Sequence, residues 1–146
     1  MKKWLIGFGL LMLATISHAE VTITHAWIRS TAPGQSVAAG YLKFVSDKDV
    51  TLISLSSPVA NSVAVHEMIM NGDVMKMREV KQLNLKAGKA VELTPDSYHL
   101  MFNEIKHPIK DGEAVPVDFV FSGKDNIHST VSIKIIARSS DPNQSH

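Results

Sequence analysis

The alternation of apolar and polar residues is the feature that most restricts what this chain can fold into. Every second residue is apolar in residues 115–121, and the same pattern returns in residues 131–135. Successive side chains of a β-strand point to opposite faces of the sheet, so each run predicts a strand with one buried face. No segment shows a sustained apolar stripe of helical period. We therefore expect an all-β protein.

Turn residues divide the remaining sequence into further short apolar segments. These segments recur about every 8 to 12 residues, the spacing that is typical of a β-sandwich or barrel. The 127 residues that follow the first 19 are enough to bury a core without disulfide bonds, and their number suits a single domain. The expected strands are 21–27, 37–45, 51–55, 62–68, 74–80, 91–93, 97–102, 115–121 and 127–137.

Residues 1–19 are expected to be a cleavable export signal that takes no part in the fold. Lys2 and Lys3 precede a mostly apolar stretch, and the small residues Ser17 and Ala19 occupy the two positions that signal peptidase reads. That stretch is short for a bilayer span, which needs about 20 apolar residues, so we expect the mature protein not to be membrane-embedded. Residues 20–138 then form the β-domain. Residues 139–146 have no apolar side chain to anchor them and are expected to be a mobile tail.

The composition excludes several classes of function. The chain contains no cysteine, which removes disulfide bonds, thiolate zinc sites, iron–sulfur clusters, blue-copper centres and a cysteine-linked lipid anchor. Loss of the signal would leave 13 basic and 14 acidic residues, a formal net charge of −1 that offers no footprint for nucleic acid. There is no glycine-rich phosphate loop and no G-x-S-x-G sequence. We therefore expect a binding protein and not an enzyme.

Residues 66–101 collect the side chains that bind soft metals. This segment holds two histidines and all five methionines that follow the first 19 residues. Thioethers and imidazoles carry no charge of their own, and together they favour a soft monovalent cation, which points to Cu(I). A thioether cannot be lost to disulfide formation and has no proton to lose. Such a site suits an oxidising compartment.

Strand parity predicts that these ligands converge. Residues two apart in a strand share a face, so His99 and Met101 would point together. The same parity joins the ligand-capable residues on each side of the Asn71-Gly72 turn signal, which are His66, Met68, Met70, Met75 and Met77. A hairpin that closes at this turn, placed beside the 97–102 strand, would bring three ligand pairs into a small volume.

The spacing of four of these residues resembles the copper-binding motif of the periplasmic copper chaperone family PCuAC. His66 is followed after ten residues by Met77, after twenty-one more by His99, and after one more by Met101. The sequences HEM, MKMR and HLMF extend the similarity, as do residues 26–27, 38–42 and 115–117. The resemblance implies a cupredoxin-like Greek-key β-sandwich or barrel, a periplasmic location, and one Cu(I) per chain bound by His66, Met77, His99 and Met101.

The resemblance also implies a role and partners. The expected function is a Cu(I) metallochaperone that delivers copper to the apo CuA site of cytochrome c oxidase or to a Sco-type copper protein, and we expect a monomer. A periplasmic copper buffer or resistance protein without a dedicated client is the alternative, and a peptide-binding module with a methionine-rich edge is a third hypothesis. Methionine usually fills core gaps, so Met68, Met70 and Met75 are interpreted as residues that pack or that support the ligands from beside them, and not as ligands. The sequence leaves open whether they or His146 assist copper binding.

Overall fold

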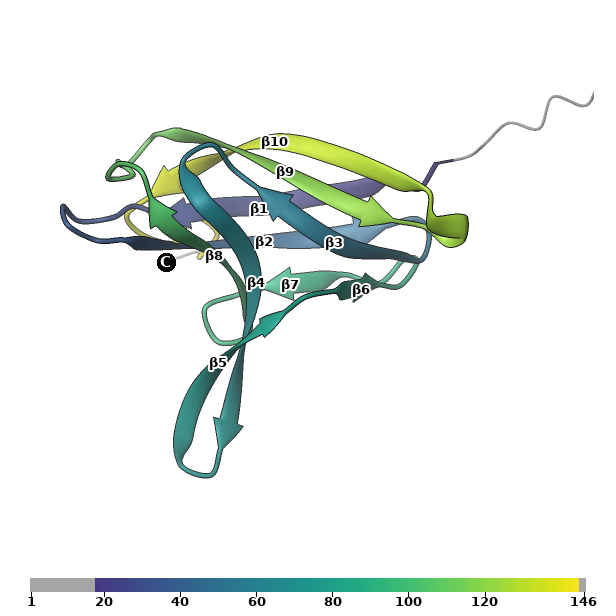
Figure 1. Ribbon diagram of the computed structural model, residues 1–146, viewed down its shortest axis with the longest axis horizontal. Coiled ribbons are helices and arrows are strands. Elements are labelled where there is room, and N and C mark those ends of the chain that lie inside the picture. Colours follow the sequence, from purple (N-terminus) through teal and green to yellow (C-terminus); the bar gives the residue numbers. More distant parts are fainter. Residues whose placement is uncertain (1–17, 145–146) are drawn as a thin grey trace, which may run out of the picture.

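Ten strands form one mixed β-sheet that curls around an apolar core in the computed structural model, which describes residues 18–144 (Figure 1). Their order in the sheet is β5-β4-β8-β7-β2-β1-β10-β9-β3-β6. The all-β prediction is confirmed. The strands are β1 (Val21–Arg29), β2 (Val37–Ser46), β3 (Val50–Ser56), β4 (Ala60–Asn71), β5 (Val74–Val80), β6 (Leu83–Leu85), β7 (Val91–Leu93), β8 (Tyr98–Ile105), β9 (Ala114–Ser122) and β10 (His128–Arg138), and one 3-10 turn, η1 (Lys124–Asn126), precedes β10.

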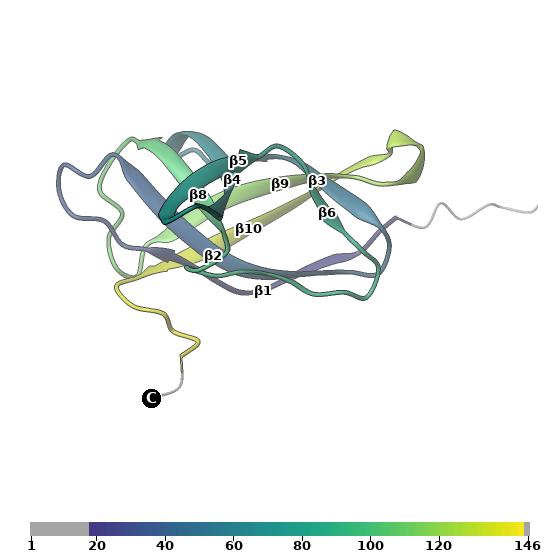
Figure 2. The same cartoon turned by 90° about the horizontal axis from the view of Figure 1, so that it is seen from below.

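The apolar face that the alternation predicts in β9 lies at the centre of the core. Phe44 of β2 contacts two phenylalanines of β9 edge-on, with ring centroids 5.6 Å from Phe119 and 5.9 Å from Phe121. All three rings are fully buried. Figure 2 shows β1 and β2 on one side of the curled sheet and β3 and β9 on the other. Burial of one such ring stabilises a fold by about 1.5–3 kcal/mol.

Two details of the strand prediction are wrong. Sequence analysis missed β6, which pairs with β3 and buries Leu83 and Leu85, because three residues are too few to show alternation. The predicted strand at residues 62–68 extends in the structure from Ala60 to Asn71. Of the added residues, Asn61, Met70 and Asn71 are exposed and only Ala60 is buried, so the two ends of the strand show no alternating burial that a sequence could reveal.

The β4–β5 hairpin projects from the body of the molecule (Figure 1). Asn71 pairs with Val74, so the two loop residues are Gly72 and Asp73, one residue later than the Asn-Gly signal indicated. Gly72 has a φ of +66°, which a glycine at the first loop position of a tight hairpin adopts without strain. Six of the seven residues of β5 are exposed. The hairpin is thus an arm, held to the body through β4.

The two ends of the described chain are hydrogen-bonded to neighbouring segments. The backbone N–H of Glu20 donates to Oδ1 of Asp47 at 2.7 Å, and Nδ2 of Asn143 donates to the carbonyl of His25 at 3.2 Å. Most of the predicted signal segment and His146 fall outside residues 18–144, and the mobility of the tail stays a prediction. Across residues 18–144, the chain forms no helix long and apolar enough to cross a membrane.

Candidate metal centre

His66 and His99 face each other across β4 and β8. They are direct partners in the antiparallel ladder, with ring centroids 5.8 Å apart and ring planes inclined by 70°. Nδ1 of His66 is buried and has no hydrogen-bond partner within residues 18–144. An unpaired buried polar nitrogen costs about 1–3 kcal/mol. Coordination of a metal ion would give this nitrogen a partner, so the pair fits a metal-binding role.

The turn before β8 fixes the position of His99. Ser97 N–H donates to the Thr94 carbonyl at 3.1 Å, and the Ser97 carbonyl accepts from Met68 N–H at 3.3 Å, which joins the turn to β4. Burial lowers the pKa of His99 below its ordinary value of 6.5, the adjacent His66 lowers it further, and a hydrogen bond with the Ser97 backbone opposes the shift. The lowered pKa favours the neutral imidazole, the form that binds metals.

The two predicted methionine ligands flank the histidine pair on the same face of the sheet. Met77 of β5 is the partner of Met68 on β4, two residues from His66. Met101 is two residues from His99 on β8 and stands opposite Ala64, whose small side chain leaves room beside it. Directly opposite residues share a face, so the register brings His66, Met77, His99 and Met101 to one surface.

Access to this surface is uneven. His99 is only 5% exposed, His66 and Met101 are half-buried, and Met77 is 55% exposed. A metal ion held by this set would therefore have a shielded side at β8 and an open side at β5. An incoming ligand could reach the ion from the Met77 side.

The opposite face of these strands belongs to the core. Leu100 lies between His99 and Met101, pairs with Val65 of β4 and with Gly40 of β2, and is fully buried. A Cβ atom at Gly40 would lie 3.1 Å from Cε2 of Phe102, so only glycine fits this close approach without movement. The ligand-bearing strand is thus supported by tight packing on its inner side.

Sequence analysis missed Glu79 as a neighbour of the candidate ligands, and it left the role of Met68 open. Glu79 stands directly opposite His66 on β5, and Met68 lies opposite Met77, between the histidine pair and the arm. Antiparallel partners are equally distant from the loop, so counting outward from Gly72-Asp73 gives both pairs, whereas the expected Asn71-Gly72 turn would have placed Met77 opposite His66 and Met75 opposite Met68. The register therefore places Met68 beside the candidate ligand Met77.

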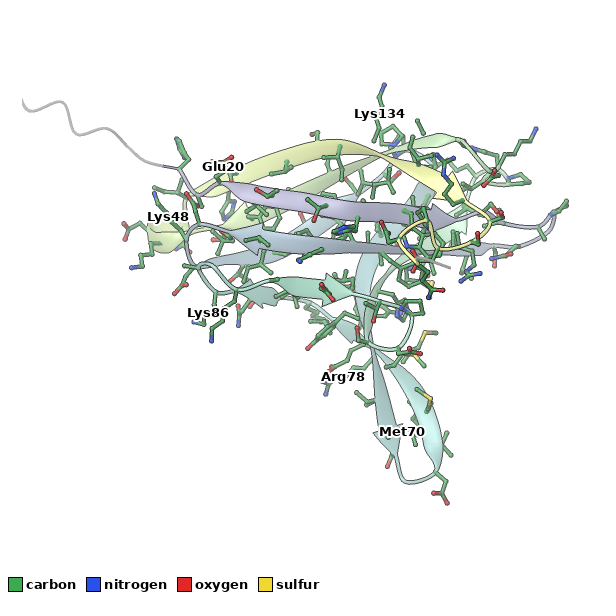
Figure 3. All side chains as sticks on the ribbon, turned by 180° about the vertical axis from the view of Figure 1, so that it is seen from behind. Glu20, Lys48, Met70, Arg78, Lys86 and Lys134 are labelled. Atoms are coloured by element: carbon green, nitrogen blue, oxygen red, sulfur yellow. The ribbon has the colours of Figure 1, made fainter. Side chains whose placement is uncertain are left out.

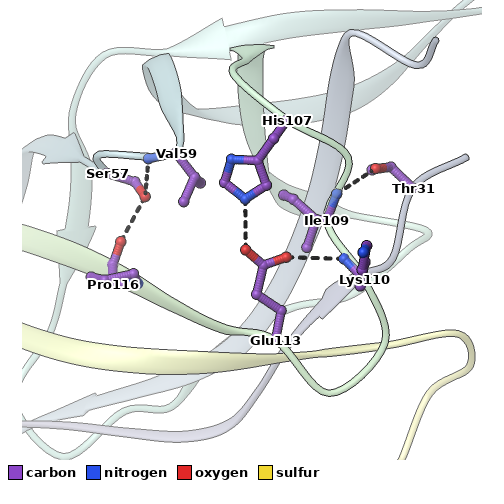
Figure 4. A network of polar contacts seen from close by, with 8 residues as sticks. All are labelled: Thr31, Ser57, Val59, His107, Ile109, Lys110, Glu113 and Pro116. Carbon is purple, nitrogen blue, oxygen red and sulfur yellow. Dashed lines mark hydrogen bonds and ion pairs between the residues drawn. The ribbon is translucent and has the colours of Figure 1, made fainter. Parts of the chain in front are cut away.

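The other described histidines do not join this group. Nε2 of His107 lies 2.6 Å from Oε1 of Glu113, whose second oxygen accepts from Lys110 N–H at 3.0 Å (Figure 4). The hydrogen bond from His107 lowers the pKa of Glu113. No group of three or more His, Cys, Asp or Glu residues in the described part of the chain could hold a metal ion. A four-ligand set around His66 and His99 would therefore include thioethers.

Comparison with known proteins gives this geometry a family context. Residues 21–133 match the family model described as "Putative lipoprotein LpqE-like". The putative lipoprotein Lxx21020 of Leifsonia xyli subsp. xyli is 26% identical over 116 residues, which cover 79% of this chain and 69% of the relative.

Solved structures share the fold. The copper-bound PCuAC domain from PmoF2 superposes with a TM-score of 0.60 at 21% identity and covers 83% of this chain and 99% of that domain. The Cu(I) form of DR1885 from Deinococcus radiodurans gives a TM-score of 0.59 at 23% identity, with 79% of this chain and 76% of that chain covered. These likenesses confirm the predicted cupredoxin-like fold. The chain belongs to the LpqE-like family, which is the PCuAC family.

Proposed function

We propose that this protein is an exported carrier of Cu(I) that binds one ion through His66, Met77, His99 and Met101 and releases it to a partner protein. The observation that carries the proposal is the His66–His99 pair, 5.8 Å apart at the ring centroids, with the buried Nδ1 of His66 unpartnered and a methionine on each side. Two neutral imidazoles and two thioethers form a soft, uncharged ligand set that prefers Cu(I) to harder divalent ions.

The uneven exposure of the ligands supports transfer over storage. His99 lies in the body of the protein, whereas Met77 is on the exposed strand of the projecting hairpin. Release by ligand exchange would begin where a ligand of the partner can approach, so Met77 is the first contact to be replaced. No proton has to move in that step because a thioether has none to gain or lose at physiological pH. We propose a carrier and not an enzyme.

The relatives support export and copper as the cargo. The matching family and the Leifsonia relative are both described as putative lipoproteins, a class of exported proteins. Two of the structural neighbours are described as copper-bound or Cu(I) forms. We propose a periplasmic location for this chain and delivery toward the CuA site of cytochrome c oxidase or to a Sco-type protein.

Anaerobic titration with Cu(I) against a coloured Cu(I) chelator tests the binding step. We expect one tightly bound ion, retained in the presence of excess Zn(II). The variants His66→Ala and His99→Ala should lose this binding, and His107→Ala should keep it, because His107 is paired with Glu113 and does not belong to the proposed ligand set. Zinc binding as tight as that of copper, or unchanged copper binding in both ligand variants, would refute the proposal.

Deletion of the gene at limiting copper tests the delivery step. A chaperone with this client should leave cytochrome c oxidase short of copper when it is absent, and the defect should disappear when copper is added. Cells that become sensitive to copper but keep a fully loaded oxidase would identify a buffer and would contradict the delivery role.

A further inference from the structure

A second pair of methionines lies on the projecting hairpin, beyond the proposed ligands. Met70 of β4 is the ladder partner of Met75 of β5, two residues outward from the Met68–Met77 pair. Strand parity places both pairs on the face that carries His66. Met70 is 63% exposed and Met75 is 55% exposed. Figure 3 shows Met70 on the arm, away from the body of the molecule.

Packing does not account for Met70 and Met75. Methionine stabilises a fold by filling gaps in an apolar interior, and both of these side chains lie mainly in solvent. The hairpin itself is held by a seven-pair ladder from Val65 to Asn71 and by the Glu67–Arg78 ion pair at 2.6 Å. An exposed apolar pair directly opposite each other at the tip therefore points to a use other than stability.

The positive charges of the hairpin lie on its other face. Lys76 and Arg78 alternate with the methionines of β5 and so point away from the methionine face. On the methionine face, two residue pairs lie between the turn and the His66–Glu79 pair. They are the four methionines, and neither pair contains a charged side chain. A monovalent cation would meet no positive side chain on this face of the arm.

The spacing of the two pairs suits a small soft ion. Directly opposite residues of a ladder have Cβ atoms about 4.5–5.5 Å apart, so two flexible methionine side chains can bring both sulfur atoms to one ion. The next residue pair on this face, Met68 with Met77, lies about 7 Å along the strands, since each residue advances 3.3–3.4 Å. Met77 is one of the proposed ligands, and Met68 lies beside it.

We propose that Met70 and Met75 form a second, weaker Cu(I) site at the tip of the arm, through which copper enters and leaves the centre at His66 and His99. Copper moves by ligand exchange: its bonds to the sulfur atoms of Met70 and Met75 break as bonds to Met68 and Met77 form. The ion stays Cu(I), and no proton or electron is transferred. The route rests on the proposed function, whereas the thioether site does not.

Anaerobic Cu(I) titration of the protein with 13C-labelled methionine ε-methyl groups tests the site. The first equivalent of copper should shift the signals of Met77 and Met101, and the second should shift those of Met70 and Met75. Signals of Met70 and Met75 that stay unmoved through the second equivalent would overturn the second site. A first equivalent that leaves the ring signals of His66 and His99 unmoved would instead refute the proposed function.

The double variant Met70→Leu/Met75→Leu tests the route, with Ile69→Leu on the opposite face of the arm as the control. We expect the double variant to lose the second binding event, to keep the affinity of the first, and to pass copper to an added chelator several-fold more slowly. The control should match the unmodified protein in the second binding event, in the affinity of the first, and in the rate of transfer to the chelator. An unchanged transfer rate in the double variant would overturn the route.

Discussion

His66 and His99 are direct partners across β4 and β8, with ring centroids 5.8 Å apart. One imidazole belongs to the strand that continues into the projecting arm, and the other belongs to a strand that the core supports from behind. Any ion held by both would connect the arm to the body.

Replacement of either methionine ligand should weaken copper binding with little cost to the fold. Met77→Leu changes an exposed side chain and should alter stability by no more than about 0.5 kcal/mol. Met101→Leu changes a half-buried one at nearly constant volume and should cost less than about 1.5 kcal/mol. Each should lower Cu(I) affinity by tenfold or more, about 1.4 kcal/mol of binding free energy.

Paired chelator competition and urea unfolding measure both effects in the same preparations. Ile69→Leu is the matched control and should leave affinity and stability close to those of the unmodified protein. If Met77→Leu and Met101→Leu unfold the protein but bind copper normally in whatever stays folded, these residues pack and do not coordinate.

Gly40→Ala should destabilise the protein, although Gly40 lies on the core side of the sheet and cannot touch a metal. The added methyl group would sit 3.1 Å from Cε2 of Phe102 and 3.4 Å from Cγ1 of Ile28. Overpacking of this kind costs about 1–3 kcal/mol. Urea unfolding of the copper-free protein measures the loss, and a stability equal to that of the unmodified protein would show that β2 and β8 adjust freely.

Acid should destabilise the copper-free protein through His99. Burial lowers the pKa of His99 in the folded state below its ordinary 6.5, so the unfolded chain binds this proton more readily. The contribution of this residue to the free energy of unfolding is therefore constant well above pH 6.5. This contribution destabilises the folded state increasingly as the pH falls from 6.5 to the lowered pKa of His99 in the folded protein.

Denaturation midpoints at pH 7.5 and 5.5 measure this difference. His99→Asn has no titrating ring at this position and should show a smaller loss of stability on acidification. His128→Asn, at an exposed histidine of β10, should keep the full loss. A pH dependence that is the same in all three proteins would assign it to other groups.

Much of the fold was predictable because a strand that is buried on one face has alternating apolar and polar residues in its sequence. Residues 115–121 show this pattern, and β9 buries Val115, Val117, Phe119 and Phe121. β6 is too short to show this alternation. The residues of the arm are mostly exposed, so the sequence could not reveal how long the arm is or that it projects from the body. The exact turn was also missed, because Asn71-Gly72 and Gly72-Asp73 are both acceptable loop pairs.

The face shared by the candidate ligands was also predictable, since residues two apart in a strand share a face whichever strand lies beside it. Which residues of neighbouring strands pair with each other was not predictable. Nothing in the spacing of His66 and His99 states that they stand directly opposite each other, because that depends on how β4 docks against β8. The burial of His99 and the exposure of Met77 follow from tertiary packing and likewise required the structure.

Copper K-edge X-ray absorption of the protein loaded with one equivalent of Cu(I) tests the central claim most directly, because it identifies the atoms bound to the metal. The account predicts both nitrogen and sulfur neighbours around a monovalent ion, with loss of nitrogen in His66→Ala and loss of sulfur in Met77→Leu. A first shell that contains only nitrogen or oxygen, or one that neither variant changes, would contradict binding by His66, Met77, His99 and Met101.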